Sequence, residues 1–231
     1  MIFNGSTKVK RLYIGSTKVK KVYKGATKVW NSGYPISYYY GNTLLGVEDV
    51  EENTDVLHPS ITMPTRENYT FCGWTLENGS YNKVTELVAT EPMNLYAMYL
   101  PNSINAVGNS RYISGSTYAS ASATPAYQGG QPLNSSVSFV LNMREYQNNS
   151  VTVVCQALYS GWVDNNQPSG NGKFDSSTIS KNGSSTFTNI SAGTHTVKTE
   201  GHTANEGDAR NTQELRCYVS TLTLSNPVAW T

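Results

Sequence analysis

Gly5-Ser6-Thr7-Lys8-Val9-Lys10 recurs ten residues later as Gly15-Ser16-Thr17-Lys18-Val19-Lys20, and again, with two changes, as Gly25-Ala26-Thr27-Lys28-Val29-Trp30. A repeat this short, punctuated by Gly and hydroxyl residues, is typical of a strand-and-turn unit. Gly supplies the positive φ that tight hairpin turns need. Because a period of ten is even, equivalent side chains return to the same face of their strands. The repeat therefore predicts a β meander with strands at 8–14, 18–24 and 28–30.

The meander is basic. Residues 1–47 hold eight Lys or Arg and no Asp or Glu, whereas residues 48–100 hold two Lys or Arg and nine Asp or Glu. Three interpretations stay open: the two segments neutralise each other, the basic segment docks on an acidic surface of the same assembly, or it contacts nucleic-acid phosphates. The third is disfavoured because one basic ribbon is a weak signal for nucleic acid.

A ribbon this thin cannot hold a core alone, so we expect it to pack on another domain, another subunit or a host surface. Its basic side chains are the candidates for attachment. They are Lys8, Lys10, Arg11, Lys18, Lys20, Lys21, Lys24 and Lys28.

The whole chain has the composition of an all-β protein. It has 231 residues with 16 Tyr and 19 Gly, only 14% of its residues are charged, and no segment shows helical periodicity. We expect tandem modules: a basic β-meander anchor at 1–33, a β-grasp-like module at 34–100, a linker or extended segment at 101–133, and a β-sandwich of immunoglobulin-like or jelly-roll-like type at 134–231. The linker is predicted from the small polar stretch at 116–126, and a first strand of the sandwich is the alternative there.

The second module contains a specific motif. Pro64-Thr65-Arg66 is followed by Tyr69-Thr70-Phe71 and Gly73-Trp74, and about twenty residues later by Leu95-Tyr96-Ala97-Met98-Tyr99. This pattern resembles the Listeria–Bacteroides repeat, or internalin B-repeat, whose usual form is P-T-R-x-G-Y-T-F-x-G-W with a closing T-L-Y-A-x-W strand. Asn68 stands where the family usually has Gly, and Tyr99 where it usually has Trp.

The resemblance covers about 65 residues. It implies a small β-grasp-like module, with or without a short helix, of the kind that serves as a spacer or contact module in bacterial surface proteins and phage structural proteins. The family brings no catalytic residues. Large apolar side chains matter most in so small a domain, so we expect its core to hold Tyr69, Phe71, Trp74, Leu95 and Tyr96.

The three cysteines, Cys72, Cys155 and Cys217, have no CxxC spacing, which argues against a disulfide scaffold or a zinc site. Buried thiols are expected, with a Cys155–Cys217 bridge across the sandwich as the alternative. The sequence has no apolar run long enough for a transmembrane helix, and its first thirty residues contain no secretory signal pattern.

Candidate sites in the third module are few. The loop from Asp164 to Asp175 places oxygen side chains at positions 1, 3 and 12, but it lacks the Gly and Glu of a calcium loop, so a surface loop is expected. His202, Glu206 and Asp208 cluster in a Gly-rich loop near His195, without evidence of convergence. Tyr159 and Trp162 are candidate glycan contacts through ring stacking.

No nucleophile elbow, P-loop or dinucleotide fingerprint is present, so the chain is expected to be neither an enzyme nor a cofactor binder. A carbohydrate-active enzyme would need a deep acidic cleft in the third module.

The N-terminal repeat also resembles the openings of structural proteins from phages of Gram-positive or gut bacteria. That resemblance implies a virion protein, assembled in the host cytoplasm and anchored by the meander, with the last module outermost as part of a tail or baseplate appendage or fibre. A capsid decoration or head-fibre protein is the first alternative, and a bacterial surface adhesin or glycan-binding module the second. Expected partners are other virion proteins, further copies of the chain (a trimer favoured) and a host-surface glycan or protein, with no membrane insertion and no nucleic acid.

Overall fold

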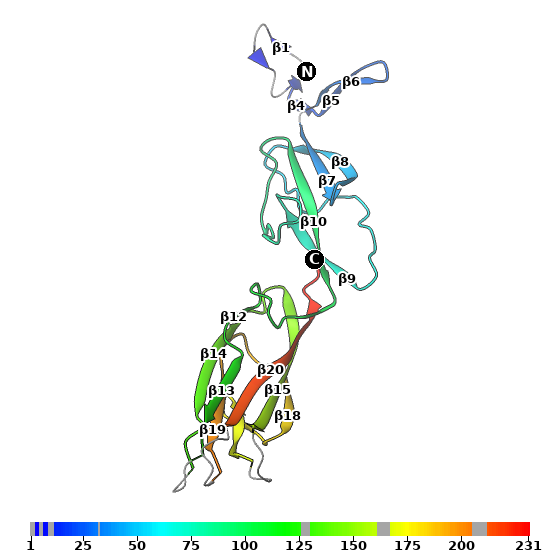
Figure 1. Cartoon of the computed structure of the whole chain (residues 1–231). Helices are drawn as coiled ribbons and strands as arrows, with labels where there is room; N and C mark the ends of the chain where they lie inside the picture. The colour runs from blue at the N-terminus through cyan, green and yellow to red at the C-terminus, as the bar shows by residue number, and fades with distance from the viewer. Residues whose placement is uncertain are drawn as a thin grey trace. The chain divides into compact units, whose positions relative to one another are not determined.

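Every regular element of the described chain is a β-strand. The computed structural model describes residues 3–4, 7–8, 12–31, 33–125, 130–160, 167–204 and 212–231. These residues form several separate sheets, so the prediction of an all-β, multi-module fold is confirmed. The chain divides into two compact units, residues 1–101 with 229–231, and residues 102–228 (Figure 1).

The N-terminal repeat forms three separate hairpins. They are β1 (Phe3–Asn4) with β2 (Thr7–Lys8), β3 (Leu12–Ile14) with β4 (Thr17–Val19), and β5 (Lys21–Lys24) with β6 (Thr27–Asn31). Gly15 and Gly25 open the two-residue turns of the second and third hairpins with φ of +63° and +60°, as a type II′ turn requires.

One hairpin per repeat corrects the prediction of three continuous meander strands. The expected strand 18–24 is interrupted at Lys20, and its two halves pair with different partners. The ten-residue repeat of the sequence therefore corresponds to one complete strand–turn–strand unit in the structure.

The sheet of the first unit has four strands: β7 (Gly33–Tyr40), β8 (Thr43–Glu51), β9 (Tyr69–Thr75) and β10 (Met93–Pro101). Their order is β8-β7-β10-β9, with the central pair parallel and both outer pairs antiparallel. This second-first-fourth-third order with a parallel centre is that of a β-grasp sheet. The described connections 52–68 and 76–92 contain no helix, so the module closes its core with loops.

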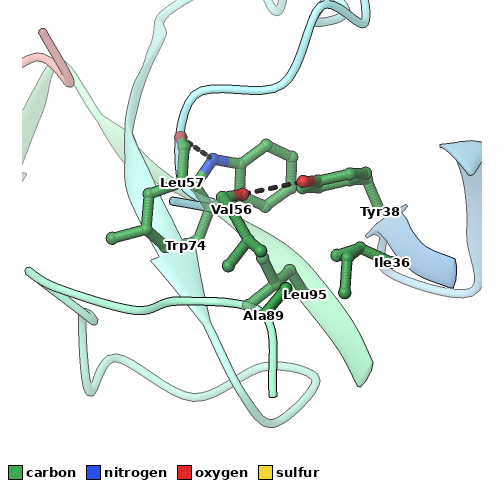
Figure 2. Packing of buried hydrophobic residues seen from close by; sticks show 7 residues of the cluster. All are labelled: Ile36, Tyr38, Val56, Leu57, Trp74, Ala89 and Leu95. Carbon is green, nitrogen blue, oxygen red and sulfur yellow. Dashed lines mark hydrogen bonds between the residues drawn. The ribbon is translucent and has the colours of Figure 1, made fainter. Parts of the chain in front are cut away.

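Two aromatic side chains fasten a loop onto this sheet (Figure 2). The core cluster consists of Ile36, Tyr38, Val56, Leu57, Trp74, Ala89 and Leu95. The Trp74 indole N–H donates to the Leu57 carbonyl at 3.0 Å, and the Tyr38 hydroxyl donates to the Val56 carbonyl at 2.8 Å. The two rings meet edge-on with centroids 5.0 Å apart. Each ring thus buries a large apolar area and satisfies a loop carbonyl at its polar end.

The predicted core residues of this module fall in different places. Trp74 and Leu95 are fully buried, and Phe71 is half-buried against the cluster. Tyr69 is 38% exposed, which corrects its prediction as a core residue. Tyr96 lies outside the cluster and stacks on Tyr39 at 5.4 Å, because neighbours on a strand face opposite sides of the sheet.

The second unit is a sandwich of two five-stranded sheets. One contains β11 (Ser103–Asn105), β13 (Tyr118–Ala123), β15 (Tyr146–Ser160), β18 (Gly183–Thr188) and β20 (Thr212–Pro227); the other contains β12 (Ile113–Gly115), β14 (Ser135–Leu141), β16 (Ser169–Phe174), β17 (Ser177–Ile179) and β19 (Gly193–His202). The sheets approach closely at Gly172, where an added Cβ would lie 2.6 Å from the Cys217 Sγ. Glycine is therefore needed there for packing.

The expected linker at 101–133 belongs to this sandwich. It supplies β11, β12 and β13, two of which pair with β20. The sandwich ends at Val228, and residues 229–231 return to the first unit, where the Trp230 N–H donates to the Phe71 carbonyl at 3.0 Å. The second unit is therefore inserted in the chain of the first. No sequence pattern indicated that the C-terminal residues 229–231 belong to the first unit.

The cysteines are free and buried. Cys155 and Cys217 are opposite residues on adjacent strands of one sheet, which corrects the alternative of a bridge across the sandwich. Burial raises the pKa of Cys217 to about 12 and also raises the pKa of Cys155. Both groups therefore remain thiols at neutral pH.

Candidate functional site

The hairpin repeat exposes several large apolar side chains to solvent. Ile14 is 76% exposed, more than any other large apolar side chain of the described residues, and Tyr13 and Tyr23 are also exposed. Within the part of the chain that the structure describes, each hairpin is a two-stranded sheet whose two outer edges pair with no further strand. An isolated two-stranded hairpin is only marginally stable in water. The open edges and exposed apolar side chains of this segment are features of a surface that can pair with other strands.

The predicted basic side chains lie along these hairpins to the extent that the structure describes them. Lys20, Lys21 and Lys24 are exposed, and the Lys20 Nζ lies 3.0 Å from a Glu51 carboxylate oxygen. That contact joins the basic repeat to the acidic module through an exposed lysine, where an ion pair adds little stability. Lys8, Lys18 and Lys28 lie in β2, β4 and β6, while Lys10 and Arg11 lie outside the described residues.

A pocket of about 290 Å³ lies at the end of the grasp module that holds the β7–β8 turn. Its walls come from β7, β10, the loop after β9 and the loop that carries the Pro-Thr-Arg motif. They are lined by Tyr40, Gly41, Arg66, Asn78, Gly79, Ser80, Tyr81, Ala97, Met98 and Tyr99. Sequence reasoning used the motif only for the fold and missed this pocket.

Arg66 is the charged group of the pocket, and it is held by aromatic rings. Its guanidinium carbon lies 3.9 Å from the Tyr69 ring centroid, 5.1 Å from that of Tyr40 and 5.7 Å from that of Tyr99. The guanidinium makes no hydrogen bond or ion pair with any described residue. Its planar donors are therefore oriented by cation–π contacts and remain available to another acceptor.

The backbone around Arg66 is fixed by two further contacts. The Tyr99 hydroxyl donates to the Pro64 carbonyl at 2.6 Å, and the Tyr69 amide donates to the Arg66 carbonyl at 3.3 Å. Asn68, in this turn, has φ of +60°, a conformation that Asn tolerates better than most residues and Gly best. Burial raises the pKa of Tyr99, so its hydroxyl stays a donor at neutral pH.

Of the two predicted glycan contacts, one lies within the described residues. Tyr159 is exposed near the end of β15, and Trp162 lies outside the described residues.

The predicted polar clusters of the third module are partly structural. Residues 169–174 of the expected surface loop form strand β16. His195 is buried, with Nδ1 at 2.8 Å from a carboxylate oxygen of Asp175 and Nε2 at 2.9 Å from the Ser191 carbonyl. Both ring nitrogens therefore have hydrogen-bond partners within the sandwich. Glu206 and Asp208 lie outside the described residues.

A hollow of the second unit, of about 490 Å³, is lined by residues 134–136 and 198–200. Its one carboxylate belongs to Glu200, which forms an ion pair with Lys173 at 2.5 Å. In the part of the chain that the structure describes, no group of three His, Cys, Asp or Glu side chains could hold a metal ion. No helix of the described residues is long and apolar enough to cross a membrane.

Comparison with known proteins found no matching family model, no similar curated protein and no similar solved structure.

Proposed function

We propose that this chain is a non-enzymatic structural protein of a bacteriophage virion, in which the N-terminal hairpin repeat attaches each copy to the particle. The observation that carries the attachment role is the exposure of Ile14, Tyr13 and Tyr23 on hairpins with open edges. Such edges pair readily with other strands, and burial of the apolar side chains would accompany that pairing.

The repeat also supports a closed homo-oligomer, of which we propose a trimer. Identical hairpins on identical chains can complete one another's sheets around a rotation axis, which leaves no edge open. Eight basic residues without a single acid in residues 1–47 would bring positive charge to that axis, so an acidic surface on the particle is the expected counterpart.

The grasp module of the first unit and the whole second unit are then the displayed part of a tail or baseplate appendage or fibre. The second unit is inserted in the first, so two covalent connections join them. The virion assignment itself rests on the resemblance of the repeat to phage structural proteins, and the strand order of the first unit is compatible with the B-repeat resemblance.

The test is incorporation into particles. Phage carrying the gene without residues 1–32 should release virions that lack the protein by mass spectrometry, although the truncated protein remains folded in the lysate. Replacing Lys20, Lys21 and Lys24 by Ala should reduce incorporation, whereas Ala at Lys173, Lys181 and Lys198 in the second unit should not. Normal incorporation of the truncated protein would refute the proposal.

A further inference from the structure

We infer that the Arg66 pocket of the grasp module is a binding site for a single neutral sugar residue at the end of a glycan. This inference is independent of the assembly role, because it concerns a pocket formed within one chain. It also differs in place from the glycan contacts at Tyr159 and Trp162 that the sequence suggested.

The lining has the composition that sugar recognition requires. Tyr40, Tyr81 and Tyr99 contribute aromatic rings to the lining, and the C–H side of a pyranose packs well against such rings. Polar groups stand between them: the guanidinium of Arg66, the amide of Asn78 and the hydroxyl of Ser80. A pocket with apolar walls and a few convergent polar groups is the usual form of a small-ligand site.

Part of this site is ordered before any ligand enters. The Asn78 side-chain amide donates to the Asn42 side-chain oxygen at 3.0 Å, which joins the loop after β9 to the β7–β8 turn. The Asn82 amide donates to the Ser80 hydroxyl oxygen at 3.1 Å. Together with the stacked Arg66, these contacts reduce the conformational entropy lost on binding.

Size and charge select the class of ligand. A volume of about 290 Å³ is at the small end for ligand pockets, so it fits one sugar unit. The guanidinium repels a cationic ligand. The Asn78 amide and the Ser80 hydroxyl add neutral hydrogen-bonding groups to the lining, and these suit the hydroxyl groups of an uncharged sugar. A neutral hexose or N-acetylhexosamine satisfies both conditions.

The experiment is a titration of the isotope-labelled full chain with glucose, galactose, N-acetylglucosamine and N-acetylgalactosamine, followed by amide chemical shifts. At least one sugar should bind with a Kd on the order of millimolar and shift the amides of residues 40–42 and 78–81. Binding should change little between 50 and about 300 mM salt, since no ion pair forms.

Variants separate the pocket from the rest of the chain. Tyr81 is 49% exposed, so Tyr81→Ala should fold normally and weaken binding about tenfold; Arg66→Lys, which keeps the charge and removes the planar donors, should do the same. Tyr118→Ala, at an exposed tyrosine of the second unit, is the matched control and should leave binding unchanged.

Three results would overturn the inference. They are the absence of shifts with every neutral sugar at about 50 mM, shifts that persist unchanged in Tyr81→Ala, and a salt-sensitive preference for N-acetylneuraminic acid or glucuronate over the neutral sugars.

Discussion

Replacing Tyr38 by Phe removes a single oxygen from the centre of the first unit. The ring is fully buried and keeps its edge-on contact with Trp74, so no large cavity is created. What is lost is the 2.8 Å hydrogen bond to the Val56 carbonyl, which leaves a buried loop carbonyl without this donor. The expected cost is about 1–2 kcal/mol of unfolding free energy at pH 7.

The same substitution should change the response to alkali. Burial raises the pKa of Tyr38 above its ordinary value of 10, and the negative charges of Glu48 and Asp55 add to the shift. The neutral phenol is therefore favoured in the folded chain. Its contribution to stability is complete below pH 10 and is lost as the pH rises above 10 toward the folded-state pKa. Tyr38→Phe should weaken this alkaline loss, and Tyr99, whose pKa burial also raises, should retain part of it.

The assay is urea unfolding with hydrogen exchange read on peptides that cover residues 34–57, at pH 7 and again near pH 10.5. Tyr39→Phe is the matched control because its ring stacks on Tyr96 and its hydroxyl makes no hydrogen bond with the described residues. A Tyr38→Phe protein as stable as the Tyr39→Phe protein at pH 7, with an unchanged alkaline loss, would refute the reasoning.

Three further outcomes follow from the packing. Cys155 and Cys217 should react with a thiol reagent only on unfolding, and fast labelling of the native chain would contradict their burial. Gly172→Ala should destabilise the sandwich by about 1–3 kcal/mol, because its new methyl would lie 2.6 Å from the Cys217 Sγ. Adding Cys217→Ala should recover part of that loss, and strict additivity in calorimetry would argue against the contact. Trp230→Ala should free the tail and increase hydrogen exchange near Phe71 and His58, on which the indole packs; unchanged exchange there would contradict the tail's placement.

Sequence patterns were most informative where local chemistry decides the structure. The Gly-Ser and Gly-Ala pairs predicted the tight turns because positive φ is a local requirement, which Gly15 and Gly25 meet. The strand partners were not predictable, since pairing depends on contacts distant in the chain. An unbroken strand through Lys20 and two strands separated there have the same side-chain pattern.

The core of the first unit was also only partly predictable from the sequence. Trp74 and Leu95 are buried as their size suggests, whereas Tyr69 forms an exposed platform for Arg66. Alternation along β10 could have separated Tyr96 from Leu95, because adjacent residues cannot face one side. The returning tail with Trp230 had no signal, since its partner residues lie more than a hundred positions earlier.

The Arg66 pocket could not be predicted from the sequence, because its residues are also distant in the chain. Its wall residues come from four separate segments, and Arg66 is distinguished only by the three rings around it. The Pro-Thr-Arg motif was the available signal, because an Arg within an aromatic-rich module has cation–π partners at hand.

The most direct test of the account is the mass of the chain in solution, measured by light scattering during size-exclusion chromatography. The full chain should form a trimer of three times its 25.3 kDa mass, and a chain that begins at Gly33 should be a monomer. A full-length protein that remains a monomer, or a truncated protein that still forms the trimer, would contradict the claim that the hairpin repeat assembles it.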